Sequence, residues 1–147
     1  MPEHASPPFT TFEHSGDLGI RAAGQDFYEA LANASAGLMS QVIEGGTVDD
    51  HEDLPVSVDG NDSSDQAIAL LNEILYLAYG KGWLTGRVRQ LTSCSRTGCQ
   101  TLDAHLSGES LDPARHHFRR EIKAVTYHGF TIRQEHGLTI IEFICDL

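Results

Sequence analysis

The order of helical and strand-like segments is the feature that most limits the folds open to this chain. Apolar residues recur at helical spacing over residues 27–40 and 67–79. Short segments with strand-like alternation lie before, between and after these two, and most follow one another without an intervening helix. Parallel strands need a long crossover, usually a helix, whereas antiparallel strands can be joined by tight turns. The sequence therefore predicts an α+β fold, a mainly antiparallel β-sheet with two α-helices packed on it.

Polar and glycine-containing clusters separate the predicted strands. Ser15-Gly16-Asp17 separates the first two, and the acidic stretch from Glu44 to Glu52 is expected to be a loop. Gly129 and Gly137 are expected to form the turns of a three-stranded meander near the end of the chain. The predicted strands cover residues 9–14, 18–24, 54–58, 87–95, 100–106, 121–128, 130–135 and 138–145.

Both helices are preceded by residues that cap a helix N-terminus. Asp26 with Glu29, and Ser63 with Gln66, have the spacing of a capping box. We therefore expect Asp26 and Ser63 to be the N-terminal caps of the two helices.

The second helix is apolar on several faces, so we expect it in the middle of the core, ending at Gly80. Asn72 and Glu73 interrupt its apolar surface. They either point outward or make buried contacts that need hydrogen-bond partners.

Length and charge restrict the class of protein. A chain of 147 residues fits a single domain over residues 1–147, of which we expect residues 1–8 to be flexible. No apolar run approaches the roughly 18–20 residues of a membrane helix, and residues 1–8 lack a secretory signal, so we expect a cytoplasmic protein without membrane contact. The net charge of −11 repels phosphate backbones and argues against unaided nucleic-acid binding. It is compatible with binding divalent metals or docking on a basic partner.

The three cysteines do not indicate a zinc site, because the chain lacks the Cys and His spacings of one. Cys145 lies in an apolar strand and is expected in the core. Cys94 and Cys99 bracket a predicted turn, where a disulfide is geometrically feasible. We expect reduced thiols, as is usual in the cytoplasm.

Carboxylates near the two ends of the chain are the candidate metal ligands. Asp17 follows Ser15-Gly16, a turn that allows close approach to another group. At the other end, the expected C-terminus Leu147 places a free α-carboxylate beside the Asp146 side chain. Carboxyl groups with reference pKa values of about 3.3–3.9 are ionised at neutral pH, so three that converge need a cation. Oxygen-only ligands suit calcium, magnesium or manganese better than zinc. The alternative to a metal site is that Asp17 caps a turn and the C-terminus is solvated.

Four further residues are candidates for contact with a phosphate or a partner protein: His14, Lys123, Thr126 and His128. Both histidines lie at predicted strand ends, where the alternative is a packed turn residue. Alternation along residues 121–128 places Thr126 and His128 on one face, and Lys123 on the other unless a bulge intervenes.

His116 and His117 precede a pair of arginines, Arg119 and Arg120. Consecutive strand residues face opposite ways, so the two histidines cannot both serve one site. We expect a solvated basic loop here, with contact to a phosphate or an acidic partner as the alternative.

Several of these segments resemble the archease family, in the same order along the chain. The segment from Phe12 to Ile20 is similar to the family pattern FEHTADIGI, with Ser15-Gly16 in place of the usual Thr-Ala. The other matching segments are Leu71 to Tyr76, Leu111-Asp112-Pro113 with His116, Lys123 to His128, and Asp146-Leu147.

The resemblance implies an α+β fold with a metal site near the C-terminus. The family's ligands fall on Asp17, Asp146 and Leu147, and the implied cofactor is a divalent ion, calcium first, with magnesium or manganese as alternatives. The resemblance also implies a non-enzymatic activator of an RtcB-type, GTP-dependent RNA ligase. Such a protein promotes guanylylation of the ligase and its repeated turnover in tRNA splicing or RNA repair, and it meets RNA and GTP only through the ligase.

Two other classes of function remain open. A metal-dependent phosphatase or nuclease would use the same carboxylates, with His128 as the base. A chaperone-like binding module would act through an apolar surface. The chain contains no nucleophile elbow, P-loop or dinucleotide fingerprint that would indicate another enzyme class.

Overall fold

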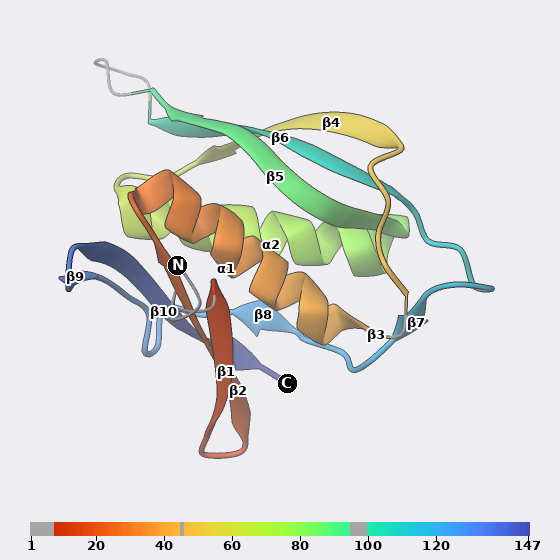
Figure 1. Ribbon diagram of the computed structural model, residues 1–147, viewed down its shortest axis with the longest axis horizontal. Helices are drawn as coiled ribbons and strands as arrows, with labels where there is room; N and C mark the ends of the chain where they lie inside the picture. Colours follow the sequence, from red (N-terminus) through yellow and green to blue (C-terminus); the bar gives the residue numbers. More distant parts are fainter. Residues whose placement is uncertain (1–7, 45, 95–99) are drawn as a thin grey trace, which may run out of the picture.

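A computed structural model describes residues 8–44, 46–94 and 100–147, in which two β-sheets enclose a layer of two helices (Figure 1). The α+β fold is confirmed, although the strands divide into separate sheets. The flexibility expected for residues 1–8 concerns a segment that lies, except for Pro8, outside the described residues. No helix within the described ranges is long and apolar enough to cross a bilayer.

The larger sheet is antiparallel and contains the first hairpin and the last strand. Strand β2 pairs with β1 on one side and with β10 on the other, and β10 pairs on its far side with the short strands β8 and β9. The last strand of the chain is therefore central in this sheet. The bounds are β1 Phe9–His14, β2 Asp17–Gly24, β8 Ala124–Val125, β9 Thr131–Glu135 and β10 Leu138–Asp146.

Strands β8 and β9 form one interrupted strand along β10 rather than successive strands of a meander. Thr131 is opposite Glu142, whereas Val125 is opposite Cys145. From Val125 to Thr131 the chain advances six residues, whereas their partners on β10 are three residues apart. The three extra residues form a turn at residues 127–129. The meander predicted over 121–145 was wrong because turn residues do not indicate which strands pair.

The second sheet lies on the other side of the helices and has β6 between β4 and β5. The two-residue strands β3 and β7 pair with each other. Strand β3 precedes the second sheet along the chain, and β7 follows it. Residues 46–51 lead from β3 to β4 without regular structure, as expected from their composition. The bounds are β3 Ile43–Glu44, β4 Glu52–Asp59, β5 Trp83–Ser93, β6 Thr101–Ser110 and β7 His117–Phe118.

Helix α1 (Phe27–Val42) begins at the predicted cap. The Asp26 side chain accepts a hydrogen bond from the backbone N–H of Glu29 at 2.9 Å. Glu29 in return accepts one from the backbone N–H of Gln25 at 2.6 Å. These reciprocal bonds satisfy donors that a helix start leaves free.

Helix α2 (Ser63–Lys81) is longer than predicted at both ends. Asp62 is its N-cap, and its side chain accepts a bond from the N–H three residues on at 2.8 Å. The helix continues through Gly80 and ends at Gly82, whose φ of 64° is a left-handed conformation that glycine adopts readily. The predictions of Ser63 as the cap and Gly80 as the end of the helix were therefore wrong. Asp62 and Ser63 can both cap a helix, and Gly80 and Gly82 can both end one, so residue type alone did not decide between them.

The described cysteines differ in state. Cys145 is buried and free, as expected for a core residue. Burial raises the pKa of its thiol to about 12, so it is protonated at neutral pH and unsuited to act as a nucleophile. Cys94 is disulfide-bonded, so the expectation of a reduced thiol was wrong there; Cys99 lies outside the described residues.

Candidate metal centre

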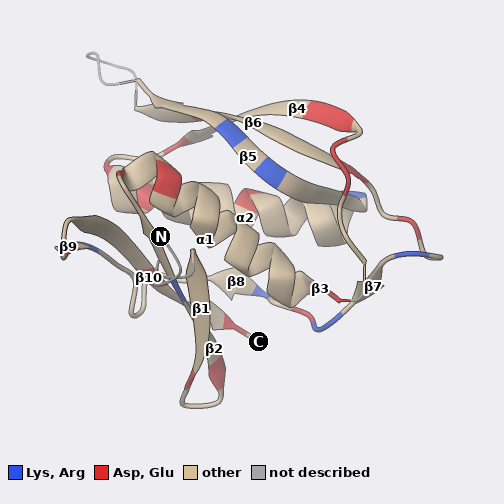
Figure 2. Ribbon diagram, viewed as in Figure 1, with Lys and Arg blue, Asp and Glu red and all other residues tan. Residues whose placement is uncertain are grey.

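The register of β2 and β10 places Asp17 and Asp146 side by side. The last paired residues are Leu18 and Cys145, so the next row of the sheet holds the two aspartates. Opposite residues on antiparallel strands project from one face, with Cβ atoms about 4.5–5.5 Å apart. Leu18 and Cys145 are buried in the core, and alternation turns the aspartates to the opposite, solvent side. Figure 2 shows acidic residues at the start of β2 and the end of β10.

Two histidines lie at the edge of this row. His14 is opposite Asp17 in the pair of β1 and β2. His128 approaches from the turn between β8 and β9, and the two imidazole centroids are 6.0 Å apart with one ring edge facing the other. Both histidines are exposed. Thr126 lies two rows from the aspartates, where its backbone N–H is 3.5 Å from the carbonyl oxygen of Ile144.

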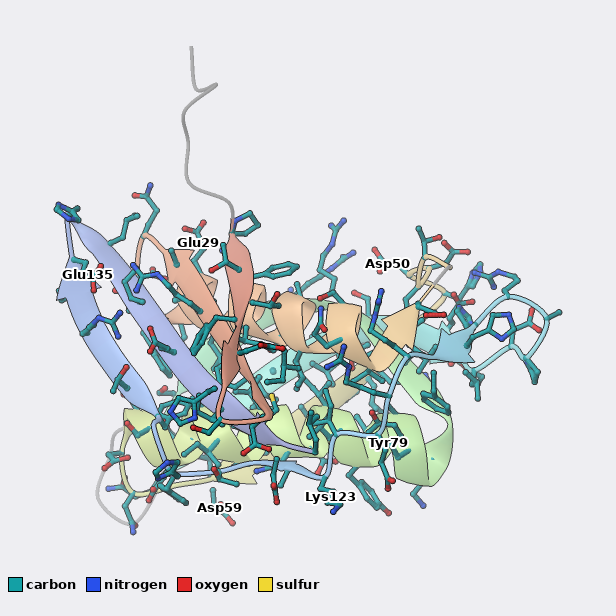
Figure 3. All side chains as sticks on the ribbon, turned by 90° about the horizontal axis from the view of Figure 1, so that it is seen from below. Glu29, Asp50, Asp59, Tyr79, Lys123 and Glu135 are labelled. Carbon is teal, nitrogen blue, oxygen red and sulfur yellow. The ribbon has the colours of Figure 1, made fainter. Side chains whose placement is uncertain are left out.

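The backbone of Lys123 contacts the end of β10. Its N–H donates to the carbonyl oxygen of Asp146 at 2.8 Å, and the next residue, Ala124, is the cross-strand partner of Asp146. The lysine side chain is exposed, on the side of the molecule where Figure 3 also labels Tyr79. The continuous strand predicted over 121–128 was wrong, because only Ala124 and Val125 pair with β10. Alternation therefore does not decide which side chains of this segment face the site.

Two side chains of α2 hold the chain between β7 and β8 in place. Asn72 Nδ2 donates to the carbonyl of Val125 at 3.0 Å, and the Val125 N–H donates to Asn72 Oδ1 at 2.9 Å. The Tyr79 hydroxyl donates to the carbonyl of Arg120 at 2.8 Å and accepts from the N–H of Ile122 at 3.1 Å. These four bonds satisfy backbone groups that have no strand partner on this side. Of the two interpretations left open for Asn72, the partnered contact is correct.

Leu147 is half-buried and packs against the hydrophobic core, beside the exposed Asp146. In the described part of the chain, the one group of three His, Cys, Asp or Glu ligand atoms within 4.8 Å of one another lies elsewhere. The described side chains at this end of β10 therefore do not by themselves form a three-ligand group.

The other group consists of Asp49, His51 and Glu109. Arg115 already occupies it: two guanidinium nitrogens lie 3.0 Å from the two Glu109 oxygens, and one lies 3.2 Å from Asp49 Oδ2. A guanidinium bound in this bidentate way supplies the positive charge that the carboxylates need. The group is a salt-bridge network that fastens the 46–51 loop to β6.

His116 is buried next to this network, so the solvated loop expected from the sequence was wrong at this residue. Its Nδ1 accepts a hydrogen bond from the N–H of Asp112 at 2.9 Å. The proton of the neutral ring is therefore on Nε2, which lies 3.2 Å from both Glu109 Oε2 and the Thr47 carbonyl. Both ring nitrogens of His116 are thus within hydrogen-bond distance of groups in the fold.

Glu109 should make the stability of the fold depend on pH in the acidic range. Hydrogen bonds from Arg115 and from the N–H of Asp49 lower the pKa of this carboxyl from 4.5 to about 2. Because the folded state has the lower pKa, the carboxylate stabilises the fold above about pH 4.5, and this contribution is lost as the pH falls towards 2. We expect the thermal midpoint of the wild type to fall over this range more steeply than that of Glu109→Gln. Parallel curves for the two proteins would contradict this role.

Similarity to known proteins identifies the family. The sequence profile of the archease protein family (MTH1598/TM1083) matches residues 9–147. The chain belongs to the archease family. The protein archease of Thermococcus gammatolerans is 31% identical over 137 residues, which cover 92% of this chain and 96% of the relative. That of Sulfurisphaera tokodaii is 28% identical over 145 residues, covering 95% and 98%.

Solved structures agree with this family assignment. The solution structure of protein 1598 from Methanobacterium thermoautotrophicum has a TM-score of 0.77 at 25% identity and covers 95% of this chain and 99% of its own. A crystal structure from Thermotoga maritima, described as an archease and possible chaperone, has a TM-score of 0.60 at 20% identity, covering 92% and 94%. The second likeness shows the fold alone. The family expected from the sequence motifs is thus confirmed.

Proposed function

We propose that this archease is a divalent-metal-binding activator of an RtcB-type RNA ligase, with Asp17, Asp146 and the α-carboxylate of Leu147 as metal ligands. The observation that carries the proposal is the adjacent placement of the two aspartates at the end of β10, where Leu147 packs on the core. Like charges at this spacing repel one another, and a bound cation removes the repulsion. Calcium is the proposed ion, with magnesium or manganese as alternatives, because every ligand atom is an oxygen.

The other candidate residues would contact the partner. His14 and His128 lie at the edge of the aspartate row, and Thr126 lies two rows away. The exposed ammonium of Lys123 can contact a phosphate or a carboxylate. When bound, a divalent ion would offset negative charge on the GTP phosphates in the ligase. The ligase performs the guanylylation and the joining of RNA ends, so the archease is proposed to be non-catalytic.

The overall charge suits this role. With a net charge of −11, the protein would be steered towards a basic, RNA-binding ligase in the cytoplasm. In this proposal RNA and GTP are reached through the ligase, in tRNA splicing or in RNA repair.

An assay of GTP-dependent labelling of a cognate ligase tests the proposal. We expect the wild type to increase labelling and turnover. Changes around a metal site typically cost about 10–100-fold in affinity or activity. Asp17→Asn should reduce metal affinity and ligase stimulation by at least this factor. Asp59→Asn, which alters an exposed carboxylate in the other sheet (Figure 3), is the matched control and should stimulate normally. Stimulation by Asp17→Asn at the wild-type level would exclude the proposed role.

Two other functions make different predictions. A metal-dependent phosphatase or nuclease would turn over its substrate without a ligase and would lose activity on chelation. A chaperone, the possible role stated for the Thermotoga maritima archease, would suppress aggregation of unrelated proteins without metal. It would also tolerate Asp17→Asn.

A further inference from the structure

Among the residues that the structure describes, four cations have no carboxylate partner. Within the described ranges, every other lysine or arginine has a carboxylate oxygen within 4.0 Å; these are Arg21, Arg87, Arg89, Arg115 and Arg133. No described carboxylate pairs in this way with Lys81, Arg119, Arg120 or Lys123. In a chain with a net charge of −11, unpaired cations gathered together indicate a place where an anion binds.

Exposed aromatic rings lie among these cations. Tyr76 and Phe118 are 52% and 44% exposed. The Phe118 ring centroid is 5.1 Å from that of Tyr79, and Tyr79 is one helical turn from Tyr76 on the surface of α2. Lys81 Nζ lies 5.9 Å from the centroid of the Tyr76 ring. We call the following residues the basic–aromatic strip: Tyr76, Lys81, Phe118, Arg119, Arg120 and Lys123.

The backbone of the strip is held before any ligand arrives. The Tyr79 hydroxyl bridges two backbone groups, as described above, and the N–H of Arg119 donates to the carbonyl of Val42 at 2.8 Å. One end of the strip, Lys123, adjoins Asp146 at the candidate metal centre. Figure 2 shows basic positions between β7 and β8 on the side of the C-terminus. A fixed backbone lowers the entropy lost on binding.

We propose that the basic–aromatic strip binds single-stranded nucleic acid, with phosphates on the cations and bases stacked on Tyr76 and Phe118. Cations alone would suit any polyanion, whereas exposed rings add the stacking surfaces that single-strand binding uses. The choice of RNA over DNA rests on the proposed function, in which the partner is an RNA ligase. Direct contact with RNA goes beyond that function, which reaches RNA only through the ligase. Because the rest of the surface is acidic, binding is local and weak.

Fluorescence anisotropy of a short labelled oligoribonucleotide, titrated with the full chain at low salt, tests this proposal. We expect Phe118→Ala to weaken binding about 5-fold or more, the cost of losing one stacked base. Arg120→Gln should weaken binding and reduce the slope of log affinity against log salt by about 0.7. Two matched controls should bind as the wild type does: Tyr28→Ala, which removes a ring that is 37% exposed on α1, and Arg89→Gln, at a cation paired with Asp50.

Each outcome decides for or against the strip. A wild-type protein that does not bind the oligonucleotide, or strip variants that bind as the controls do, would overturn the proposal. Complete displacement by GTP would indicate a mononucleotide site and would also overturn it. Equal affinity for RNA and DNA would support a single-strand site and overturn the choice of RNA. Arg120 is exposed, so its variant keeps the test valid if Phe118→Ala does not fold.

The failure of this inference can be told apart from the failure of the proposed function. Asp17→Asn leaves the strip unchanged and should bind RNA normally while losing ligase stimulation. The strip variants should bind divalent metal normally, because none of the altered residues is a proposed ligand.

Discussion

Adding a Gly-Ser pair after Leu147 is expected to abolish ligase stimulation and to weaken divalent-metal binding. The extension converts the α-carboxylate into a neutral peptide group and moves the new terminus away from the aspartates. Changes in outer-shell contacts cost about 10–100-fold in metal affinity, so removing the proposed direct ligand should cost more. Calorimetric titration with calcium and with manganese measures the affinity, and GTP-dependent labelling of the ligase measures the stimulation.

The control for this extension is the same pair of residues added before Met1. The Leu147 side chain packs on the core in either protein, so the thermal midpoint without metal should not change. Wild-type metal affinity in the protein extended at Leu147 would exclude the terminal carboxylate as a ligand. It would leave the two aspartates as the remaining candidates.

Asn72→Ala is expected to lower the free energy of unfolding and to reduce ligase stimulation together. The side chain satisfies both backbone groups of Val125, a residue that is 2% exposed. Each buried group left without a partner costs about 1–3 kcal/mol. The loss also frees β8, which pairs with Asp146 through Ala124, so the proposed ligand should become less well positioned. Urea unfolding and the ligase assay measure the two effects.

The neighbouring substitution Glu73→Ala is the control for Asn72→Ala. Glu73 is half-buried in the same turn of α2 and takes part in no ion pair among the described residues. We expect its unfolding free energy to stay within about 0.5 kcal/mol of the wild type. If Asn72→Ala matched Glu73→Ala in stability, the hydrogen bonds to Val125 would not contribute as described.

Local patterns located the elements that carry the proposed site. The predicted strands 9–14, 18–24 and 138–145 agree with β1, β2 and β10 to within one residue at each end. Asp26 was also correct as the first helix cap. These features depend on alternation, turn residues and side chains a few positions apart, all of which are visible in a sequence.

Contacts between distant residues were not predicted. Asn72 and Val125 are 53 positions apart, and Asp49 and Glu109 are 60 positions apart. Glu109 lies within a strand, where a charge is uncommon unless it is paired. That was the one local signal for the network with Arg115, but it did not indicate the partner. The burial of His116 escaped prediction for the same reason.

The sequence by itself determined the fold class, the elements near both ends of the chain, and the identity of three candidate carboxylates. Only the tertiary structure decided that Asp17 and Asp146 are neighbours. A shift of one residue between β2 and β10 would move one aspartate to the other face of the sheet. The register is set by the burial of Leu18, Ile20 and Phe143 against the helices, which is a property of the whole core.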